Sequence, residues 1–198
     1  MKENELVSNL SNFEWQKIRN KYHIPNHGMD PENAAEILFE VDDILKSLNI
    51  KYYLACGTAL GFYRDGNFIP WDDEIDIEIL SETFVPILKE LREKFISSGF
   101  IARATYRGKT SKMPIFKKGV KVALCSVYDN GAGFHCDLNQ KFPSKFYENP
   151  EEFTFKERKF TMPGPIADYL SFYYGDWQTV IKSYDVNEYL NKNRQWKK

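Results

Sequence analysis

The chain has 198 residues, 42% hydrophobic and 16% aromatic, which is enough for a large core in one domain and excludes a disordered protein. Its formal net charge of −1 gives no reason to expect nucleic-acid binding. Residues 1–5 lack the apolar core of a signal peptide, and no apolar run approaches the ~20 residues of a membrane span. The three cysteines, an odd number, predict free thiols in a reducing compartment, so we expect a cytoplasmic protein without a membrane span.

Helical patterns dominate the first fifty residues. Residues 4–22 carry apolar side chains with a loose helical period. Asp30 is predicted to cap a second helix, with Pro31 in its first position. Apolar residues then recur at i, i+3 and i+4 spacing, which predicts an amphipathic helix over 31–48.

Four elements are expected between residues 50 and 100, in the order strand, helix, strand, helix. They are a strand over 51–56, a short helix over 58–63 that begins at the turn of Gly57, an acidic strand from Asp72 onward, and a helix over 82–98 that Ser81 caps and Gly99 ends.

The second half of the chain is predicted to be mostly strand. The expected strands lie near 100–106, 113–117, 120–128, 133–139, 153–156 and 158–162. The run from Asp129 to Gly131 marks a hairpin, and a helix over 165–175 is expected to end at Gly175. A mixed β-sheet flanked by helices, with an N-terminal helical segment, makes the predicted fold class α+β.

The strand that begins at Asp72 carries the strongest functional signal. Acidic and apolar residues alternate strictly along it. The acids are Glu74, Asp76 and Glu78, and the apolar residues between them are Ile75, Ile77 and Ile79. Because successive side chains of a strand point to opposite faces, the isoleucines would enter a core, and the acids would share the other face about 6.5–7 Å apart at the α-carbon. Such carboxylates repel one another unless a cation neutralises them, which predicts a metal site. The alternative is an edge strand with a solvated acidic face.

Two linked motifs run through this region. They are Gly57-Thr58-x-Leu60-Gly61-x-x-Arg64 and Gly66-x-Phe68-Ile69-Pro70-Trp71-Asp72-Asp73-x-Ile75-Asp76-Ile77. Together they resemble the LicD family of the nucleotidyltransferase superfamily, strongly over residues 31–80 and more weakly beyond. The resemblance implies a single nucleotidyltransferase-like domain over 1–198, divided into a helical appendage (1–29), a catalytic core (30–140) and C-terminal strands with a helix (141–198).

The resemblance further implies that three carboxylates bind a divalent metal ion, Mg²⁺ or Mn²⁺. They are Glu74, Asp76 and Asp137, and Glu74 stands where family members usually have Asp. Asp137 is expected on a strand beside the acidic one, where it would bind metal, accept a proton from the attacking hydroxyl, or both. The alternative for Asp137 is an ordinary turn aspartate. Asp72 would support the metal-binding carboxylates by holding the turn after Trp71, and Asp73 would be structural.

Phosphate binding is expected from the glycine turn and from a nearby arginine. Gly57 and Thr58 would bring backbone N–H groups and a hydroxyl toward phosphate oxygens, at the start of the helix that follows. The planar guanidinium of Arg64 would clamp two phosphate oxygens. The alternative is a surface arginine that pairs with Asp65.

Seven basic residues and no acid fall within residues 103–121. Lys112 is the expected diphosphate contact among them, and the other six are expected at the surface, because a charge run is usually a solvated face. Aromatic side chains near the acids, Trp71 among them, are candidates to stack on a cytosine ring or to enclose a quaternary ammonium group.

The resemblance therefore implies a metal-dependent phosphotransferase. It would move a phospho-alcohol, phosphocholine or a polyol phosphate, from a CDP-linked donor to a hydroxyl group and release CMP. The acceptor would be a glycan or lipid-linked glycan of lipopolysaccharide, teichoic acid or capsule, with no nucleic acid involved. Two alternatives stay open. A nucleotidyltransferase would move NMP from an NTP and release pyrophosphate, and a non-catalytic module would only bind nucleotide or glycan.

Overall fold

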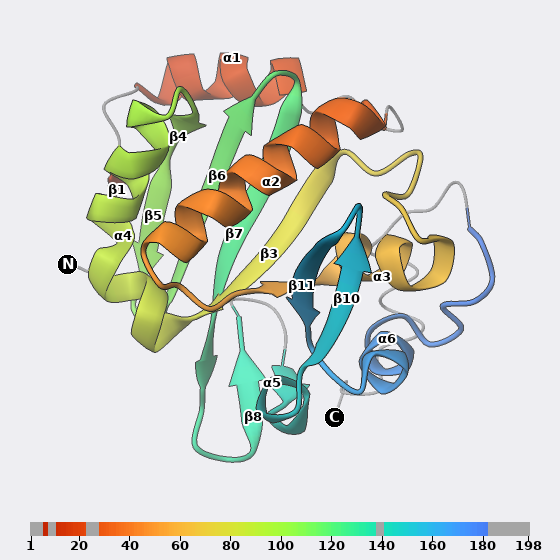
Figure 1. The fold of residues 1–198 in the computed structure, drawn as a ribbon. Helices are drawn as coiled ribbons and strands as arrows, with labels where there is room; N and C mark the ends of the chain where they lie inside the picture. Colours follow the sequence, from red (N-terminus) through yellow and green to blue (C-terminus); the bar gives the residue numbers. More distant parts are fainter. Residues whose placement is uncertain (1–5, 8–10, 23–27, 138–140, 182–198) are drawn as a thin grey trace.

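The computed structural model describes residues 6–7, 11–22, 28–137 and 141–181. Its helices are α1 (Asn12–Tyr22), α2 (Pro31–Ser47), α3 (Cys56–Asp65), α4 (Ser81–Ser97), α5 (Lys145–Glu148) and α6 (Ile166–Tyr174). Its strands are β1 (Leu6–Val7), β2 (Tyr53–Leu54), β3 (Glu74–Leu80), β4 (Ile101–Ala102), β5 (Ala104–Arg107), β6 (Thr110–Lys117), β7 (Val120–Asp129), β8 (Phe134–Cys136), β9 (Lys141–Pro143), β10 (Glu151–Phe155) and β11 (Arg158–Met162). The predicted α+β class is confirmed (Figure 1).

The main sheet is mixed and has the order β1-β5-β6-β7-β3-β2. Strand β3 runs parallel to β7 and antiparallel to β2, and the remaining pairs in this order are antiparallel. Strand β4 pairs with β6, β8 pairs with the end of β7 and with β9, and β10 and β11 form a separate hairpin. Because β3 has partners on both sides, the alternative of an acidic edge strand is wrong.

Two helices cover one face of this sheet. Helices α2 and α4 lie across its front in Figure 1, while α3, α6 and the β10–β11 hairpin lie beside β2. The isoleucines of β3 point into the core under the helices, where Ile75, Ile77 and Ile79 are 0%, 1% and 0% exposed. Burial of each stabilises the fold by roughly 1.5–3 kcal/mol. The acidic side chains of β3 therefore lie on the opposite face of the sheet, where Tyr147 of α5 donates to Glu78.

N-terminal caps were predicted for two helices, at Asp30 and at Ser81. Asp30 caps α2 as predicted, since its Oδ1 accepts a hydrogen bond from the Asn33 N–H at 2.8 Å. The cap predicted for Ser81 is wrong. Leu80 occupies the N-cap position of α4, and the buried Ser81 hydroxyl has no hydrogen-bond partner among the described residues.

Several boundaries differ from the predicted ones because strand ends follow their partners and not only their own sequence. The strand predicted over 51–56 shrinks to β2, since only two of its residues pair with β3. The strand predicted over 100–106 is divided into β4 and β5. Strands β1 and β9 and helix α5 were not predicted, whereas the hairpin at residues 129–131 and the end of α6 at Gly175 are confirmed. Parts of the predictions for 4–22 and 133–139 lie outside the described residues.

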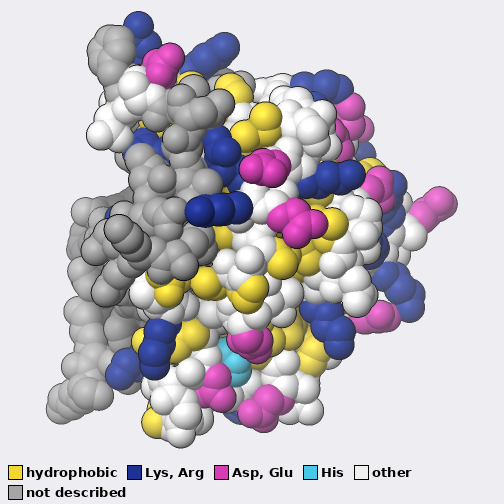
Figure 2. Space-filling view, turned by 90° about the vertical axis from the view of Figure 1, so that its left-hand side faces the viewer, with side chains coloured by type: hydrophobic (Ala, Val, Ile, Leu, Met, Phe, Trp, Pro, Cys, Tyr) yellow, Lys and Arg dark blue, Asp and Glu magenta, His cyan; other side chains and the backbone are white. Residues whose placement is uncertain are grey.

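The surface carries both charge signs. On the described part of the face in Figure 2, basic and acidic side chains are interspersed, in keeping with the small net charge. None of the described helices combines the length and the apolar character that crossing a membrane requires. A cytoplasmic location stays a prediction. Cys56 and Cys125 are free thiols.

Candidate active site

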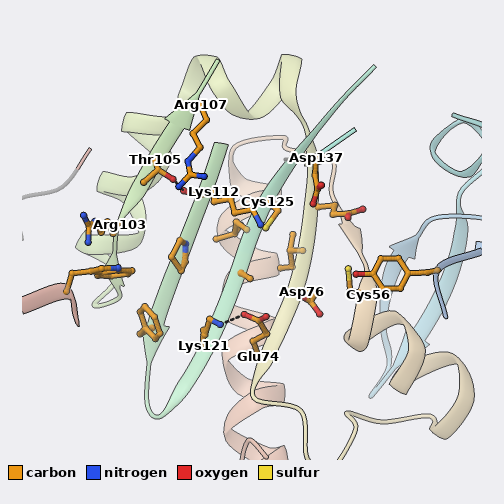
Figure 3. A pocket seen from close by; sticks show the side chains of 18 residues that line it. Cys56, Glu74, Asp76, Arg103, Thr105, Arg107, Lys112, Lys121, Cys125 and Asp137 are labelled. Carbon is orange, nitrogen blue, oxygen red and sulfur yellow. Dashed lines mark hydrogen bonds and ion pairs between the residues drawn. The ribbon is translucent and has the colours of Figure 1, made fainter. Parts of the chain in front are cut away.

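The face of the main sheet opposite α2 and α4 holds a pocket of about 540 Å³ (Figure 3). Strand register arranges its side chains in rows across β3, β7, β6 and β5. One row consists of Glu78, Cys125, Lys112 and Thr105, each paired with the next. The neighbouring row runs from Asp76 through Ala123 to Pro114, whose carbonyl accepts the Arg103 N–H. The acidic residues of β3 therefore line one side of the pocket, with Lys121 beside Glu74, and the basic residues Lys112, Arg103 and Arg107 lie toward β6 and β5.

The first turn of α3, which contains Gly57 and Thr58, is hydrogen-bonded to the acidic strand β3. The Gly57 N–H donates to Asp76 Oδ2 at 3.1 Å, and the Asp76 N–H donates to Thr58 Oγ1 at 2.8 Å. A Cβ on Gly57 would lie 2.4 Å from Asp72 Oδ2 and 3.5 Å from Asp76 Oδ2. A larger residue at position 57 would therefore displace the Asp72 carboxylate, whereas its distance to Asp76 is an ordinary contact.

Like charges are crowded on the acidic side. Burial raises the pKa of Asp72 to about 7, and the charges of Glu74 and Asp73 act in the same direction. Burial, Glu74 and Asp72 likewise raise the pKa of Asp76 well above its ordinary value. Lys121 forms an ion pair with Glu74, drawn as a dashed line in Figure 3. Burial acts to lower the pKa of Lys121, but Glu74 outweighs it and the pKa rises. The cluster favours the addition of positive charge.

Glu78 is a pocket residue that the sequence analysis left without a role. It is 5% exposed, and the Tyr147 hydroxyl donates to its Oε2 at 2.8 Å. Burial raises its pKa to about 7, against the effect of the Tyr147 hydrogen bond. The alternation of β3 had already placed Glu78 on the face of Asp76. What the sequence did not reveal was Tyr147, which lies on α5.

Asp137 and Lys112 reach the same pocket from different strands. Asp137 follows β8, which pairs with β7 and β9, so the prediction that its strand lies beside the acidic one is wrong. Its side chain nevertheless lines the pocket with Glu78 and raises the pKa of that carboxyl group. The pKa of Lys112 is raised by its neighbours, by Cys125 first and then by Asp137.

Four predicted phosphate or substrate contacts, Gly57, Thr58, Arg64 and Trp71, do not line this pocket. The Thr58 side chain is 1% exposed, and its hydroxyl accepts from the Asp76 backbone instead of facing the pocket. Arg64 pairs with Asp65 and donates from Nη1 to the Trp177 carbonyl at 3.3 Å. Arg64 and Trp71 line a separate small pocket together with Trp177. The pair with Asp65 that the alternative named is therefore observed, but the Arg64 side chain is only 11% exposed and is not at the surface.

The prediction that the other six basic residues of the run lie at the surface is confirmed for Arg107, Lys109 and Lys118, which are exposed, whereas Arg103, Lys117 and Lys121 are half-buried. Arg103, Arg107 and Lys121 line the pocket together with Lys112. Of the others, Lys117 and Lys118 pair with Glu40 and Glu36 of α2. Sequence spacing could not separate these groups, because the order of β5, β6 and β7 in the sheet decides which positions share the face of β3.

Glu74 and Asp76 offer oxygen ligands of the kind that a divalent cation needs. No group of three or more His, Cys, Asp and Glu side chains is arranged to hold a metal ion in the described part of the chain. Mg²⁺, however, is commonly held by one or two carboxylates together with substrate phosphates and water. Glu74 and Asp76 are two such carboxylates on one face, in a cluster where added positive charge is favoured. This donor set fits a hard cation that arrives with a phosphate substrate.

Comparison with known proteins gives a family match. Residues 49–165 match the model of the LicD/FKTN/FKRP nucleotidyltransferase domain. An uncharacterized protein of Rickettsia prowazekii, RP689, is 27% identical over 159 residues, which cover 74% of this chain and 55% of that protein. The mouse ribitol-5-phosphate transferase FKTN is 25% identical over 169 residues, which cover 78% of this chain and 35% of FKTN. The chain thus spans about half the length of the first relative and about a third of the second.

Proposed function

Because this chain belongs to the LicD family, whose model covers more than half of it, we propose that it is a phosphotransferase that moves a phospho-alcohol from a CDP-linked donor to a hydroxyl group of a glycan. The pocket that joins Glu74 and Asp76 with Asp137 and Lys112 carries this proposal. The name of the mouse relative, a ribitol-5-phosphate transferase, supports a polyol phosphate as the transferred group, with phosphocholine as the other candidate. The acceptor is a free or lipid-linked glycan of a cell-surface polymer.

The acidic side of the pocket prepares the donor. Glu74 and Asp76 would hold Mg²⁺ or Mn²⁺, which neutralises charge on a transferring phosphoryl group when it is bound. The Gly57 N–H fixes the orientation of Asp76 by its hydrogen bond to Oδ2. The Asp72 carboxylate lies against Gly57. Lys112 binds the donor diphosphate as a point charge.

Asp137 serves the acceptor hydroxyl. The hydroxyl oxygen attacks the phosphorus that lies farther from the cytidine, and Asp137 accepts the hydroxyl proton. The bond between that phosphorus and the bridging oxygen breaks, and the bridging oxygen leaves with CMP. Positioning and charge neutralisation supply most of the rate enhancement in such transfers.

The test is nucleotide-product analysis in the presence of Mg²⁺. CDP-choline, CDP-ribitol, CDP-glycerol, CTP and ATP are offered separately, and water or a sugar serves as the acceptor. We expect CMP from one CDP-linked donor, and no CMP from the Asp76→Ala variant. Asp168→Ala is the matched control, because it removes an exposed carboxylate of α6 and should retain full turnover.

The other outcomes separate the alternatives. Pyrophosphate from CTP or ATP would identify a nucleotidyltransferase. No product from any donor, together with no metal-dependent nucleotide binding, would favour a non-catalytic module. Full turnover by Asp76→Ala would refute the assignment of the acidic site.

A further inference from the structure

Cys56 has a backbone conformation that residues of its type rarely adopt. Its φ is 46°, in the left-handed region, although Ala55 before it is extended. The other described non-glycine residues with positive φ follow the end of α2 or lie in hairpin turns, and they are Asn49, Lys118, Lys156 and Glu157. Cys56 instead begins α3 and lines the pocket near Asp76 (Figure 3). Such strain persists only where the surrounding contacts hold it.

Three successive backbone N–H groups hold this turn. The Ala55 N–H donates to the Asp76 carbonyl at 3.1 Å, and the Gly57 N–H donates to the Asp76 carboxylate at 3.1 Å. Between them, the Cys56 N–H donates to the Tyr169 hydroxyl at 3.3 Å. Two of the three acceptors thus belong to β3, and the third comes from α6. Because the Gly57 N–H follows Cys56 in the chain, its direction depends on the φ of Cys56.

The Tyr169 ring is packed among other rings, and its hydroxyl reaches the turn. Tyr169 is 0% exposed, and its ring centre lies 5.8 Å from that of Phe142 and 5.6 Å from that of Phe146. A phenylalanine would make the same ring contacts, so packing alone does not require the hydroxyl. Burial raises the pKa of the Cys56 thiol well above its ordinary value, and a hydrogen bond with Tyr173 acts against this. Helix α6 therefore contacts Cys56 through both its N–H and its side chain.

We propose that Tyr169 is a positioning residue of the acidic site, and that it acts through the backbone of Cys56. Its hydroxyl holds Cys56 in the left-handed conformation, which turns the Gly57 N–H toward the Asp76 carboxylate. The inference rests on the proposed function, because it takes Asp76 to bind the divalent cation. Without the hydroxyl, the Cys56 N–H loses its acceptor and φ relaxes to negative values. The Gly57 N–H then turns away, and the Asp76 carboxylate loses the contact that orients it.

The test measures cation binding apart from turnover. Mn²⁺ is titrated into the metal-free protein, with and without CMP, and the electron paramagnetic resonance signal of free Mn²⁺ gives the affinity. Tyr169→Phe should weaken Mn²⁺ binding about tenfold, the change in population that the left-handed strain of one residue produces. Tyr52→Phe is the matched control, because it also removes a buried tyrosine hydroxyl, one that donates to Asp42 at 2.6 Å. It should leave the Mn²⁺ affinity within about twofold of the wild type.

Glycine at position 56 separates a positioning role from a merely structural one. Because glycine adopts positive φ without strain, Cys56→Gly combined with Tyr169→Phe should restore most of the Mn²⁺ affinity. Cys56→Ala combined with Tyr169→Phe keeps the strain and should not restore it. Cys56→Val in the otherwise unchanged chain is a second route to the same strain, since a β-branched residue is poorly suited to this φ. It should weaken Mn²⁺ binding more than Cys56→Ala does.

Three results would overturn the inference. They are equal Mn²⁺ affinities of the wild type and Tyr169→Phe, a loss that Cys56→Gly restores no better than Cys56→Ala, and a wild type that binds no Mn²⁺. Should Tyr169→Phe not fold, equal affinities of Cys56→Val and Cys56→Ala would overturn it in the same way. Failure of the proposed function has a different signature, since it appears as an absence of CMP release in the donor panel while Mn²⁺ binding still distinguishes the variants.

Discussion

Replacing Glu78 by glutamine should stabilise the metal-free protein at high pH and have little effect at low pH. The folded structure raises the pKa of Glu78 from 4.5 to about 7, chiefly by burial. Wild-type stability from this group is therefore fully present below pH 4.5 and is lost as the pH rises through 7, where the folded state must ionise a buried carboxyl group. The difference in pKa corresponds to about 3 kcal/mol. Glutamine keeps an oxygen that can accept the Tyr147 hydroxyl hydrogen bond but does not ionise.

The measurement is urea unfolding of both proteins in EDTA and a thiol reductant at pH 4, 6 and 8. The gain in unfolding free energy of Glu78→Gln over the wild type should grow by about 3 kcal/mol between pH 4 and pH 8. Glu90→Gln makes the same substitution on the exposed face of α4, and its difference from wild type should not change with pH. A Glu78→Gln difference that stays constant from pH 4 to pH 8 would refute the reasoning.

Three further predictions concern the turn and the metal. Gly57→Ala places a methyl group 2.4 Å from Asp72 Oδ2, so it should lower the unfolding free energy by about 1–3 kcal/mol and reduce donor turnover; unchanged urea curves would contradict this. Thr58→Val leaves the Asp76 N–H without its acceptor and should cost about 1–3 kcal/mol, whereas Thr58→Ser should retain most of the stability. Mg²⁺ should raise the melting temperature of the wild type more than that of Asp76→Ala, as measured by calorimetry; equal shifts would place the ion elsewhere.

The fold could be predicted where the signal is local. The 3.6-residue period and the Asp30 cap predicted α2, and strict alternation predicted β3. These signals depend only on residues that are neighbours in the chain. Short pieces such as β2 and β9 were mispredicted or missed because their extent depends on a partner strand. The same reason explains Ser81. A serine before an apolar run predicts a cap, but β3 continues to Leu80 and the helix takes Ser81 as its first residue.

The residues of the candidate site likewise fall into those that their neighbours in the chain reveal and those that depend on the sheet. Glu74 and Asp76 were found because their spacing places them on one face, and Lys112 and Asp137 because they follow the family's order. Arg103 and Arg107 were predicted to lie at the surface, and Arg107 is exposed. That both also line the pocket could not be predicted, since nothing in their own sequence shows that β6 and β7 bridge them to β3. Arg64 has a suitable side chain, but its position in the last turn of α3 directs it to Asp65 and Trp177.

The Gly57–Thr58 pair has a different role from the one its composition suggests. A glycine and a threonine at the start of a helix are typical of a phosphate-binding turn. Here the Gly57 N–H and the Thr58 hydroxyl are both used to bind Asp76, one through its carboxylate and the other through its backbone. The turn thus fixes the acid, and under the proposed function the positive charges that meet a phosphate would come from Lys112 and a bound cation. Thr58→Ser is therefore expected to keep activity and Thr58→Val to lose it together with stability.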